Sequence, residues 1–147
     1  MITEDSSQVV VCSTCSRRNR VPDASFGIPQ CAACHQPLLW LVNATDSSFE
    51  AATAGCLPVL VDLWAPWCGP CRAVGPAVEE SGRRLAGRLK IVKVDVDEAP
   101  GLSRRFGVQS IPMLLIVRDG KEMARHVGAL PATALAQWID RQLAAHG

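Results

Sequence analysis

The chain has 147 residues, of which 48% are apolar and 20% charged, and its formal net charge is +1 at pH 7. This composition excludes an intrinsically disordered chain, which would carry fewer apolar residues and more unbalanced charge. A nearly neutral chain is also no polyanion binder by bulk charge, so we expect no nucleic-acid partner. No segment has the uninterrupted apolar length needed to cross a bilayer, and we expect no membrane partner.

Four cysteines mark the first part of the chain. They form two Cys-x-x-Cys pairs, with 15 residues between the second and third cysteines. Zinc ribbons use this spacing, because each tight turn presents two sulfurs and two turns complete a tetrahedron. We therefore predict one structural zinc ion held by Cys12, Cys15, Cys31 and Cys34. Two disulfides, or a ribbon with free thiols, are the alternatives.

The N-terminal residues lack the basic stretch and apolar segment of an export signal. We therefore expect a cytoplasmic protein, whose cysteines serve as thiols, metal ligands or catalytic groups. The apolar segment 38–42 predicts a short strand, and no Gly/Ser linker follows it, so the ribbon should pack against what comes next. We divide the chain into a zinc-ribbon-like module, residues 1–42, and a second domain, residues 43–147. No internal repeat is visible.

An apolar strand is predicted over Val59–Trp64, where five of the six residues are apolar. Such a strand suits a mostly parallel sheet that is covered on both faces. The exception is Asp62. A carboxylate in this setting is costly to ionise, so we expect its pKa to be raised toward neutrality, which makes it a candidate base.

A second type of cysteine pair follows this strand. The chain exposes Trp67 and enters a helix at Cys68, where unpaired N–H groups and the helix dipole favour a thiolate. Gly69 allows a substrate backbone to come close, and Pro70 fits the first helical turn. Cys71 lies one turn along, within reach of the Cys68 sulfur. A four-residue ring would stabilise little as a structural disulfide, so the pattern predicts a redox-active pair.

The other expected elements complete an α/β domain with a central mixed sheet flanked by helices. They are a helix over 49–54, a helix from 68 to about 85, a strand over 89–96, a helix over 100–105, a strand over 111–117, a hairpin turn at 119–120, a strand over 122–127 and a helix over 131–145. We expect that last helix to bury Leu135, Trp138, Ile139 and Leu143, which recur at helical spacing.

The segment Trp64-Ala-Pro-Trp-Cys-Gly-Pro-Cys71 resembles the active-site signature of thioredoxins. Other residues match at the spacings which that family uses: Asp62, Pro76, Lys93, Ile111-Pro112 and Val127-Gly-Ala129. Together with the first forty or so residues, the chain resembles the zinc-containing second class of bacterial thioredoxins. This resemblance implies the thioredoxin fold, preceded by a small zinc-ribbon-like module.

The resemblance also implies roles for single residues. Pro112 would be in the cis form beside the two cysteines, so that the backbone of Ile111 can pair with an extended substrate segment. Lys93 would lie near Asp62 and oppose the upward shift of its pKa. The catalytic residues would then be Cys68, Cys71, Asp62 and Lys93. The expected substrate-binding rim consists of Trp67, Gly69, Pro70, Ile111, Pro112, Gly128 and Ala129.

We predict a protein disulfide reductase. The Cys68 thiolate attacks a substrate disulfide, and Cys71, deprotonated with help from Asp62, then attacks Cys68 and releases the product. The resemblance implies re-reduction by a flavin-containing thioredoxin reductase that draws on NADPH. This chain has no dinucleotide-binding fingerprint, so flavin and NADPH would belong to that partner. We expect a monomer that acts on oxidised proteins with disulfides.

Two other functions remain open at this stage. The first is a thiol oxidase or isomerase of an oxidising compartment, although Gly69-Pro70 resembles the reducing class. The second is a non-enzymatic zinc-ribbon adaptor or holdase. Four thiols near a redox centre also suggest that oxidative stress releases the zinc ion and changes the docking of the ribbon.

Overall fold

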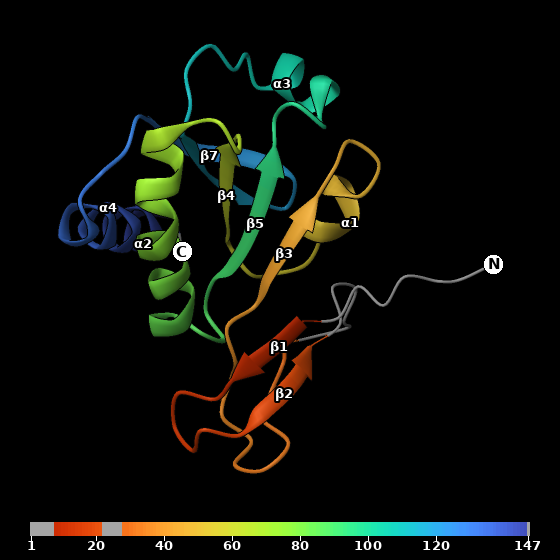
Figure 1. Cartoon of the computed structure of the whole chain (residues 1–147), viewed down its shortest axis with the longest axis vertical. Helices are drawn as coiled ribbons and strands as arrows, with labels where there is room; N and C mark the ends of the chain where they lie inside the picture. The colour runs from red at the N-terminus through yellow and green to blue at the C-terminus, as the bar shows by residue number, and fades with distance from the viewer. Residues whose placement is uncertain (1–7, 22–27, 147) are drawn as a thin grey trace.

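The structure is a computed structural model that describes residues 8–21 and 28–146. In the N-terminal part, strands β1 (Gln8–Val11) and β2 (Arg18–Val21) form an antiparallel pair. This small sheet lies at one end of the molecule, below the main sheet in Figure 1. Two segments of the expected ribbon module, residues 1–7 and 22–27, lie outside the described residues.

A five-stranded mixed sheet forms the centre of the larger part, as predicted. Its strands are β3 (Leu41–Ala44), β4 (Val59–Trp64), β5 (Lys90–Asp95), β6 (Met113–Arg118) and β7 (Lys121–Val127). They lie in the order β3-β5-β4-β6-β7, with β5 parallel to both of its neighbours and β6 antiparallel to both of its own. The hairpin turn between β6 and β7 is confirmed, because Asp119 and Gly120 both take the positive φ angles that a two-residue turn requires.

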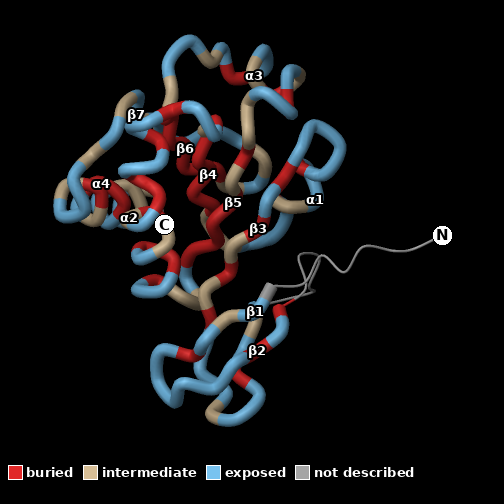
Figure 2. Tube along the Cα trace, in the orientation of Figure 1, coloured by how far each residue is buried: buried red, intermediate tan, exposed pale blue. Residues whose placement is uncertain are grey.

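Helices cover both faces of this sheet (Figure 1). They are α1 (Phe49–Thr53), α2 (Gly69–Arg84), α3 (Pro100–Arg105) and α4 (Ala132–His146). The alternation along β4 explains its apolar composition. Val61 packs with residues of α1 and α3, and Leu60 packs with residues of α2 and α4. The central strands are therefore buried on both sides, as the tube in Figure 2 shows.

Two local expectations are corrected. The apolar segment 38–42 is not one strand, because its residues serve three cores: Leu38 belongs to the ribbon core, Leu39 packs with α2 and α4, and Trp40 packs with α1 and α3. Pairing with β5 begins only at Leu41. In α4, Leu143 is partly buried rather than fully buried, because it lies one turn from the end of the helix.

The ribbon contains an internal repeat that its sequence does not display. Cys12 donates its N–H to the carbonyl of Arg17, and Cys31, 19 residues later, donates to the carbonyl of Gln36, both at 2.9 Å. The residue after each pair, Ser16 or His35, has a left-handed backbone, with φ of 67° and 64°. This repeat is one of backbone conformation, so the absence of a visible sequence repeat still holds. The two knuckles share a backbone conformation, whereas outside their cysteines they have little sequence in common.

The ribbon packs against α2 through the segment that leads into β3. A Cβ atom added at Gly82 would overlap with the side chains of Leu39 and Ile91, and one added at Gly87 would lie 3.0 Å from Pro37. The absence of side chains at these glycines lets the connecting segment approach α2 and the loop after it. The ribbon is therefore docked on the main domain rather than tethered to it, as predicted.

The packing at Gly82 predicts that one substitution has different effects at two positions of α2. Gly82→Ala should lower the free energy of unfolding by about 1 kcal/mol, because overpacking of about 1–3 kcal/mol outweighs the gain in helix propensity. Gly75→Ala is the comparison, since a Cβ there meets nothing within 4 Å beyond its neighbours in the chain. Its gain in helix propensity is offset only by Pro76, which disfavours a helical residue with a Cβ before it, so it should destabilise less than Gly82→Ala. Urea unfolding of both variants measures the difference, and equal effects would contradict close packing at Gly82.

Candidate functional site

The N-terminus of α2 holds the two cysteines that follow β4. Cys68 is the N-cap residue, with extended backbone angles, and its sulfur accepts a hydrogen bond of 3.2 Å from the backbone N–H of Cys71. The sulfur therefore takes the place of the usual N-cap oxygen and would be stabilised as a thiolate in the reduced form. The two cysteines are joined by a disulfide and are 5% and 3% exposed. The structure thus describes the oxidised state of a closely placed pair.

Asp62 is fully buried in β4, and neither of its carboxylate oxygens has a hydrogen-bond partner among the described residues. Burial raises its pKa to about 6, against an opposing effect of the positive charge of Lys93. The two residues are register partners on adjacent strands, and both lie on the sheet face that α2 covers. The Lys93 ammonium lies 4.8 Å from the ring centre of Trp64. The expected proximity of Lys93 and Asp62 is thus found.

A second loop meets the cysteine pair from the side of β6. The Ile111–Pro112 peptide bond is cis, and the carbonyl oxygen of Ile111 lies 3.8 Å from the sulfur of Cys68. The carbonyl of Pro112 accepts a hydrogen bond of 2.8 Å from Gly128. That bond joins the loop to the end of β7, next to exposed Ala129. These expected rim residues therefore come together around Cys68.

Trp67 stands out from this rim, with 68% of its surface exposed. Its indole N–H donates a hydrogen bond of 2.7 Å to a carboxylate oxygen of Asp97, which fixes the direction of the ring. The sequence analysis did not include Asp97 in the site. No motif marks it, since the two residues are 30 positions apart and meet only after β4 and β5 pair.

The four N-terminal cysteines form a compact cluster. Their sulfur atoms all lie within 4.8 Å of one another, with 3.6 Å between Cys12 and Cys34 and 3.5 Å between Cys15 and Cys31. None of the four is in a disulfide. A tetrahedral site with metal–sulfur bonds of about 2.3 Å has sulfurs about 3.8 Å apart. The arrangement therefore fits a metal ion.

The electrostatics of the cluster point the same way. A backbone N–H of Cys34 is the main cause that lowers the pKa of Cys31 to about 6, against burial, and a backbone N–H of Cys15 lowers that of Cys12. For Cys34, a backbone hydrogen bond from Gln36 lowers the pKa, but burial and the hydrogen bonds of the other three thiols together outweigh it. The pKa of Cys34 is therefore raised to about 12. Without a cation the four sulfurs thus compete for charge, and a divalent ion would allow all of them to be thiolates.

The cluster and the redox-active pair lie at opposite ends of the main sheet. The chain enters β3 and β4 from the ribbon end, and the helix that carries the pair begins where β4 finishes (Figure 1). The expectation that the four thiols lie near a redox centre is therefore wrong. The spacing of the cysteine motifs along the chain does not reveal the distance between them in space, because β4 carries the chain across the molecule before Cys68.

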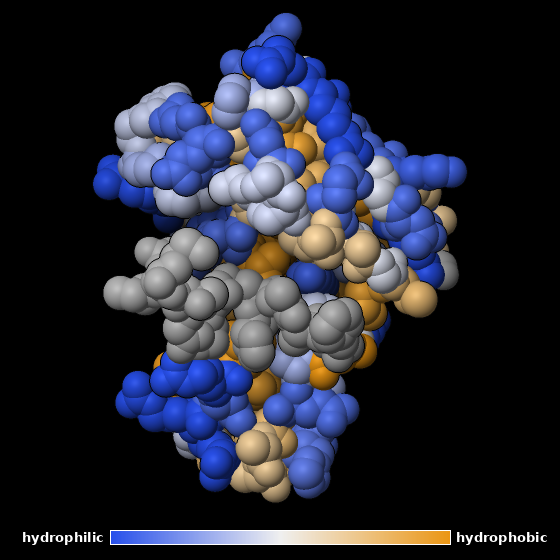
Figure 3. Space-filling view, turned by 90° about the vertical axis from the view of Figure 1, so that its right-hand side faces the viewer, coloured by the Kyte–Doolittle hydropathy of each residue, from blue (hydrophilic) through white to orange (hydrophobic). Residues whose placement is uncertain are grey.

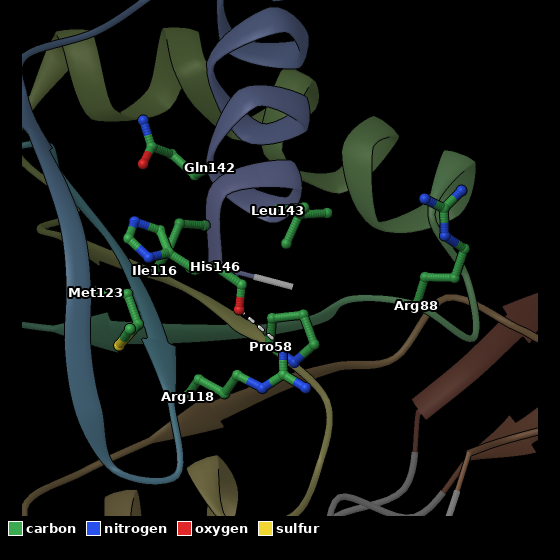
Figure 4. Close-up of a pocket in the computed structure, with 8 residues that line it drawn as sticks. All are labelled: Pro58, Arg88, Ile116, Arg118, Met123, Gln142, Leu143 and His146. Atoms are coloured by element: carbon green, nitrogen blue, oxygen red, sulfur yellow. Dashed lines mark hydrogen bonds between the residues drawn. The ribbon is translucent and has the colours of Figure 1, made fainter.

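Two hollows lie outside these sites. A cavity of about 160 Å³ has three basic residues in its lining, Arg88, Arg118 and His146. Arg118 donates a hydrogen bond of 2.9 Å to the carbonyl of His146, and Figure 4 shows Arg88 turned away from it. These side chains do not converge on one point, and Arg118 stabilises the end of α4. The second hollow, about 580 Å³, lies between α2 and the segment 129–132, beside the rim.

Among the described residues, no helix combines the length and apolar character that crossing a membrane requires.

Comparisons with known proteins agree with this geometry. The Thioredoxin family model matches residues 41–141, more than half of the chain. Thioredoxin C-3 of Corynebacterium nephridii is 38% identical over 139 residues, which cover 92% of this chain and 95% of that protein. Thioredoxin of Bacillus subtilis (strain 168) is 45% identical over 103 residues, which cover 70% of this chain and 98% of that protein.

The match with Thioredoxin C-3 is long enough to include most of the residues before Leu41, so the region of the ribbon is shared with a relative. The family model, the relatives and the disulfide at the start of α2 agree. The chain therefore belongs to the thioredoxin family and is a dithiol–disulfide oxidoreductase whose redox-active pair is Cys68 and Cys71.

Proposed function

We propose that the protein is a cytoplasmic protein disulfide reductase, re-reduced by an NADPH-dependent thioredoxin reductase, with one structural zinc ion. The observation that carries the reductase function is the Cys68 sulfur at the N-cap of α2, where it accepts the N–H of Cys71. This position favours the thiolate that attacks a substrate disulfide. Flavin and NADPH belong to the partner, thioredoxin reductase, and the oxidised substrates of this chain are proteins.

The reaction takes place in two exchanges. The Cys68 thiolate attacks one sulfur of the substrate disulfide, which forms a mixed disulfide and expels the other substrate sulfur as a thiolate. Cys71 then loses its proton to the buried carboxylate of Asp62 and attacks the Cys68 sulfur. The second substrate thiolate leaves, and the two electrons of the dithiol are now in the substrate. Lys93 tunes the pKa of Asp62.

We propose that substrates bind to the rim as extended segments. The support is the position of the Ile111 backbone, whose carbonyl oxygen lies 3.8 Å from the Cys68 sulfur. An approaching chain can form main-chain hydrogen bonds there without much reading of its side chains. The other members of this rim are Trp67, Gly69, Pro70, Gly128 and Ala129.

The order of the two exchanges can be tested with single cysteine variants. Cys68→Ser should reduce the NADPH-coupled turnover of a protein disulfide to background, because the attacking thiolate is lost and the remaining Cys71 is buried and cannot close the cycle alone. Cys71→Ser should accumulate a mixed disulfide between Cys68 and the substrate, visible as one adduct in an intact mass spectrum.

The redox potential separates a reductase from an oxidase. An equilibrium potential of about −270 mV is expected for a reductase. A potential of about −120 mV would instead support the oxidase function. If the variant with both Cys68 and Cys71 replaced by serine keeps the biological effect of the protein, the adaptor function is supported.

The buried carboxylate predicts a pH-dependent stability. Between pH 4 and pH 6 the unfolded chain has lost the Asp62 proton while the folded protein keeps it, so wild-type stability falls as pH rises through this window. Asp62→Asn should therefore be more stable at pH 7.5, by up to about 3 kcal/mol, with no gain at pH 4. Urea unfolding at both pH values measures this effect. Asp119→Asn, the same change at an exposed turn, is the control, and an equal gain there would contradict the assignment.

The zinc ion is testable by native mass spectrometry of the reduced protein, purified without chelator. We expect one zinc ion per chain and no disulfide among the four ribbon cysteines. Removal of the ion should expose the backbone amides of residues 8–21 and 28–38 to hydrogen exchange while those of the central strands stay protected. A metal-free mass with disulfides among these cysteines would contradict both the zinc site and the reducing compartment.

A further inference from the structure

Asn19 is a polar residue in the core of the ribbon. Strand β2 alternates between exposed and buried residues, and Asn19 is only 7% exposed, beside Cys31. That core is small: its apolar residues are Val21 and Leu38, with Val10 at its edge. On the side seen in Figure 3, the ribbon at the bottom shows mainly hydrophilic residues. A buried amide in so small a core costs stability unless its hydrogen bonds compensate.

The amide of Asn19 joins the two knuckles. Its Nδ2 donates to the carbonyl of Arg17 at 3.1 Å and points at the sulfur of Cys31 at 3.5 Å, and its Oδ1 accepts the N–H of Ala32 at 3.0 Å. The carbonyl of Arg17 is the same one that closes the first knuckle. The amide orientation is determined by these partners, since a backbone N–H needs an oxygen and a carbonyl needs an N–H.

The internal repeat shows that hairpin formation itself does not require an asparagine here. Asn19 pairs with Val10 across β1 and β2, and Leu38, 19 residues later, bonds to Pro29 in the equivalent way. Leu38 is 2% exposed and has a purely apolar side chain. A leucine therefore serves at one of the two equivalent positions. Leu38 packs in the same core as Cys12 and Cys31, so the difference between the two positions is polar: Asn19 also forms side-chain hydrogen bonds with a cysteine sulfur and with the opposite knuckle.

We propose that Asn19 is a positioning residue of the metal centre. It holds the two knuckles at the separation that a tetrahedral ion needs, and its N–H withdraws charge from the Cys31 sulfur. A divalent ion with four thiolates retains two negative charges, so a hydrogen-bond donor to one sulfur stabilises the loaded site. The proposal rests on the proposed zinc site. Groups in this outer position typically change metal affinity by about 10–100-fold.

The test compares Asn19→Leu and Asn19→Asp with the same two changes at Asn43, which is exposed on β3 outside the ribbon. Asn19→Leu copies the residue of the second hairpin and keeps the branching at Cγ, although leucine is the larger residue. Asn19→Asp keeps an acceptor for Ala32 but presents an oxygen to Cys31. Competition with a chromogenic chelator should show zinc affinity lowered by about 10–100-fold in both Asn19 variants and unchanged in both Asn43 variants. Wild-type affinity in Asn19→Leu would overturn the proposal.

A cobalt spectrum separates positioning from simple loosening of the ribbon. In the Co²⁺-loaded protein, loss of an N–H donor to Cys31 raises the energy of the sulfur electrons and should move the thiolate-to-cobalt band to longer wavelength in Asn19→Leu. Leu38→Ala removes apolar bulk from the same core without touching the amide, so it should weaken binding with no such shift. Equal spectra for Asn19→Leu and Leu38→Ala would overturn the role of the N–H. A wild-type chain that binds no metal would instead refute the zinc site itself.

Discussion

The N–H groups at the start of α2, which have no partner inside the helix, are the constraint on which the redox chemistry depends. Strand β4, buried between two layers of helices, leads to the N-terminus of α2, so that Cys68 is the N-cap residue and accepts one of these N–H groups. The same burial leaves Asp62 without a hydrogen-bond partner among the described residues. One strand therefore accounts both for the favoured thiolate and for a carboxyl group whose pKa lies near neutrality.

The ribbon has the opposite physical situation. Its two hairpins share little apolar surface, and the backbone turns around its cysteines are closed by their own hydrogen bonds. The free energy of folding that a larger core would provide has to come from another interaction, and a metal ion is the usual source in modules of this size. Docking on α2 also stabilises the ribbon, because the glycine at position 82 allows Leu39 to approach the helix closely.

Much of the fold could be predicted from local patterns. The strand β4, the helix after Cys68 and the turn at Asp119-Gly120 each follow from periodicity or from turn chemistry within a few residues. The limits of β3 could not, since an apolar residue does not reveal which of three cores will bury it. Asp97 and Asn19 were missed for a related reason. Each acts on a residue far away in the sequence, and no spacing rule describes such a contact.

The separation of the two sets of sulfurs has a consequence for the repair of the molecule. Thiol–disulfide exchange requires that one sulfur attack another directly. Cys68 and the ribbon cysteines are at opposite ends of a rigid sheet, so they cannot react within one chain (Figure 1). A ribbon that has become oxidised can be reduced only by a second copy or by another reductant. Its recovery is then a bimolecular process whose rate depends on protein concentration, and a single isolated molecule cannot reduce its own ribbon cysteines.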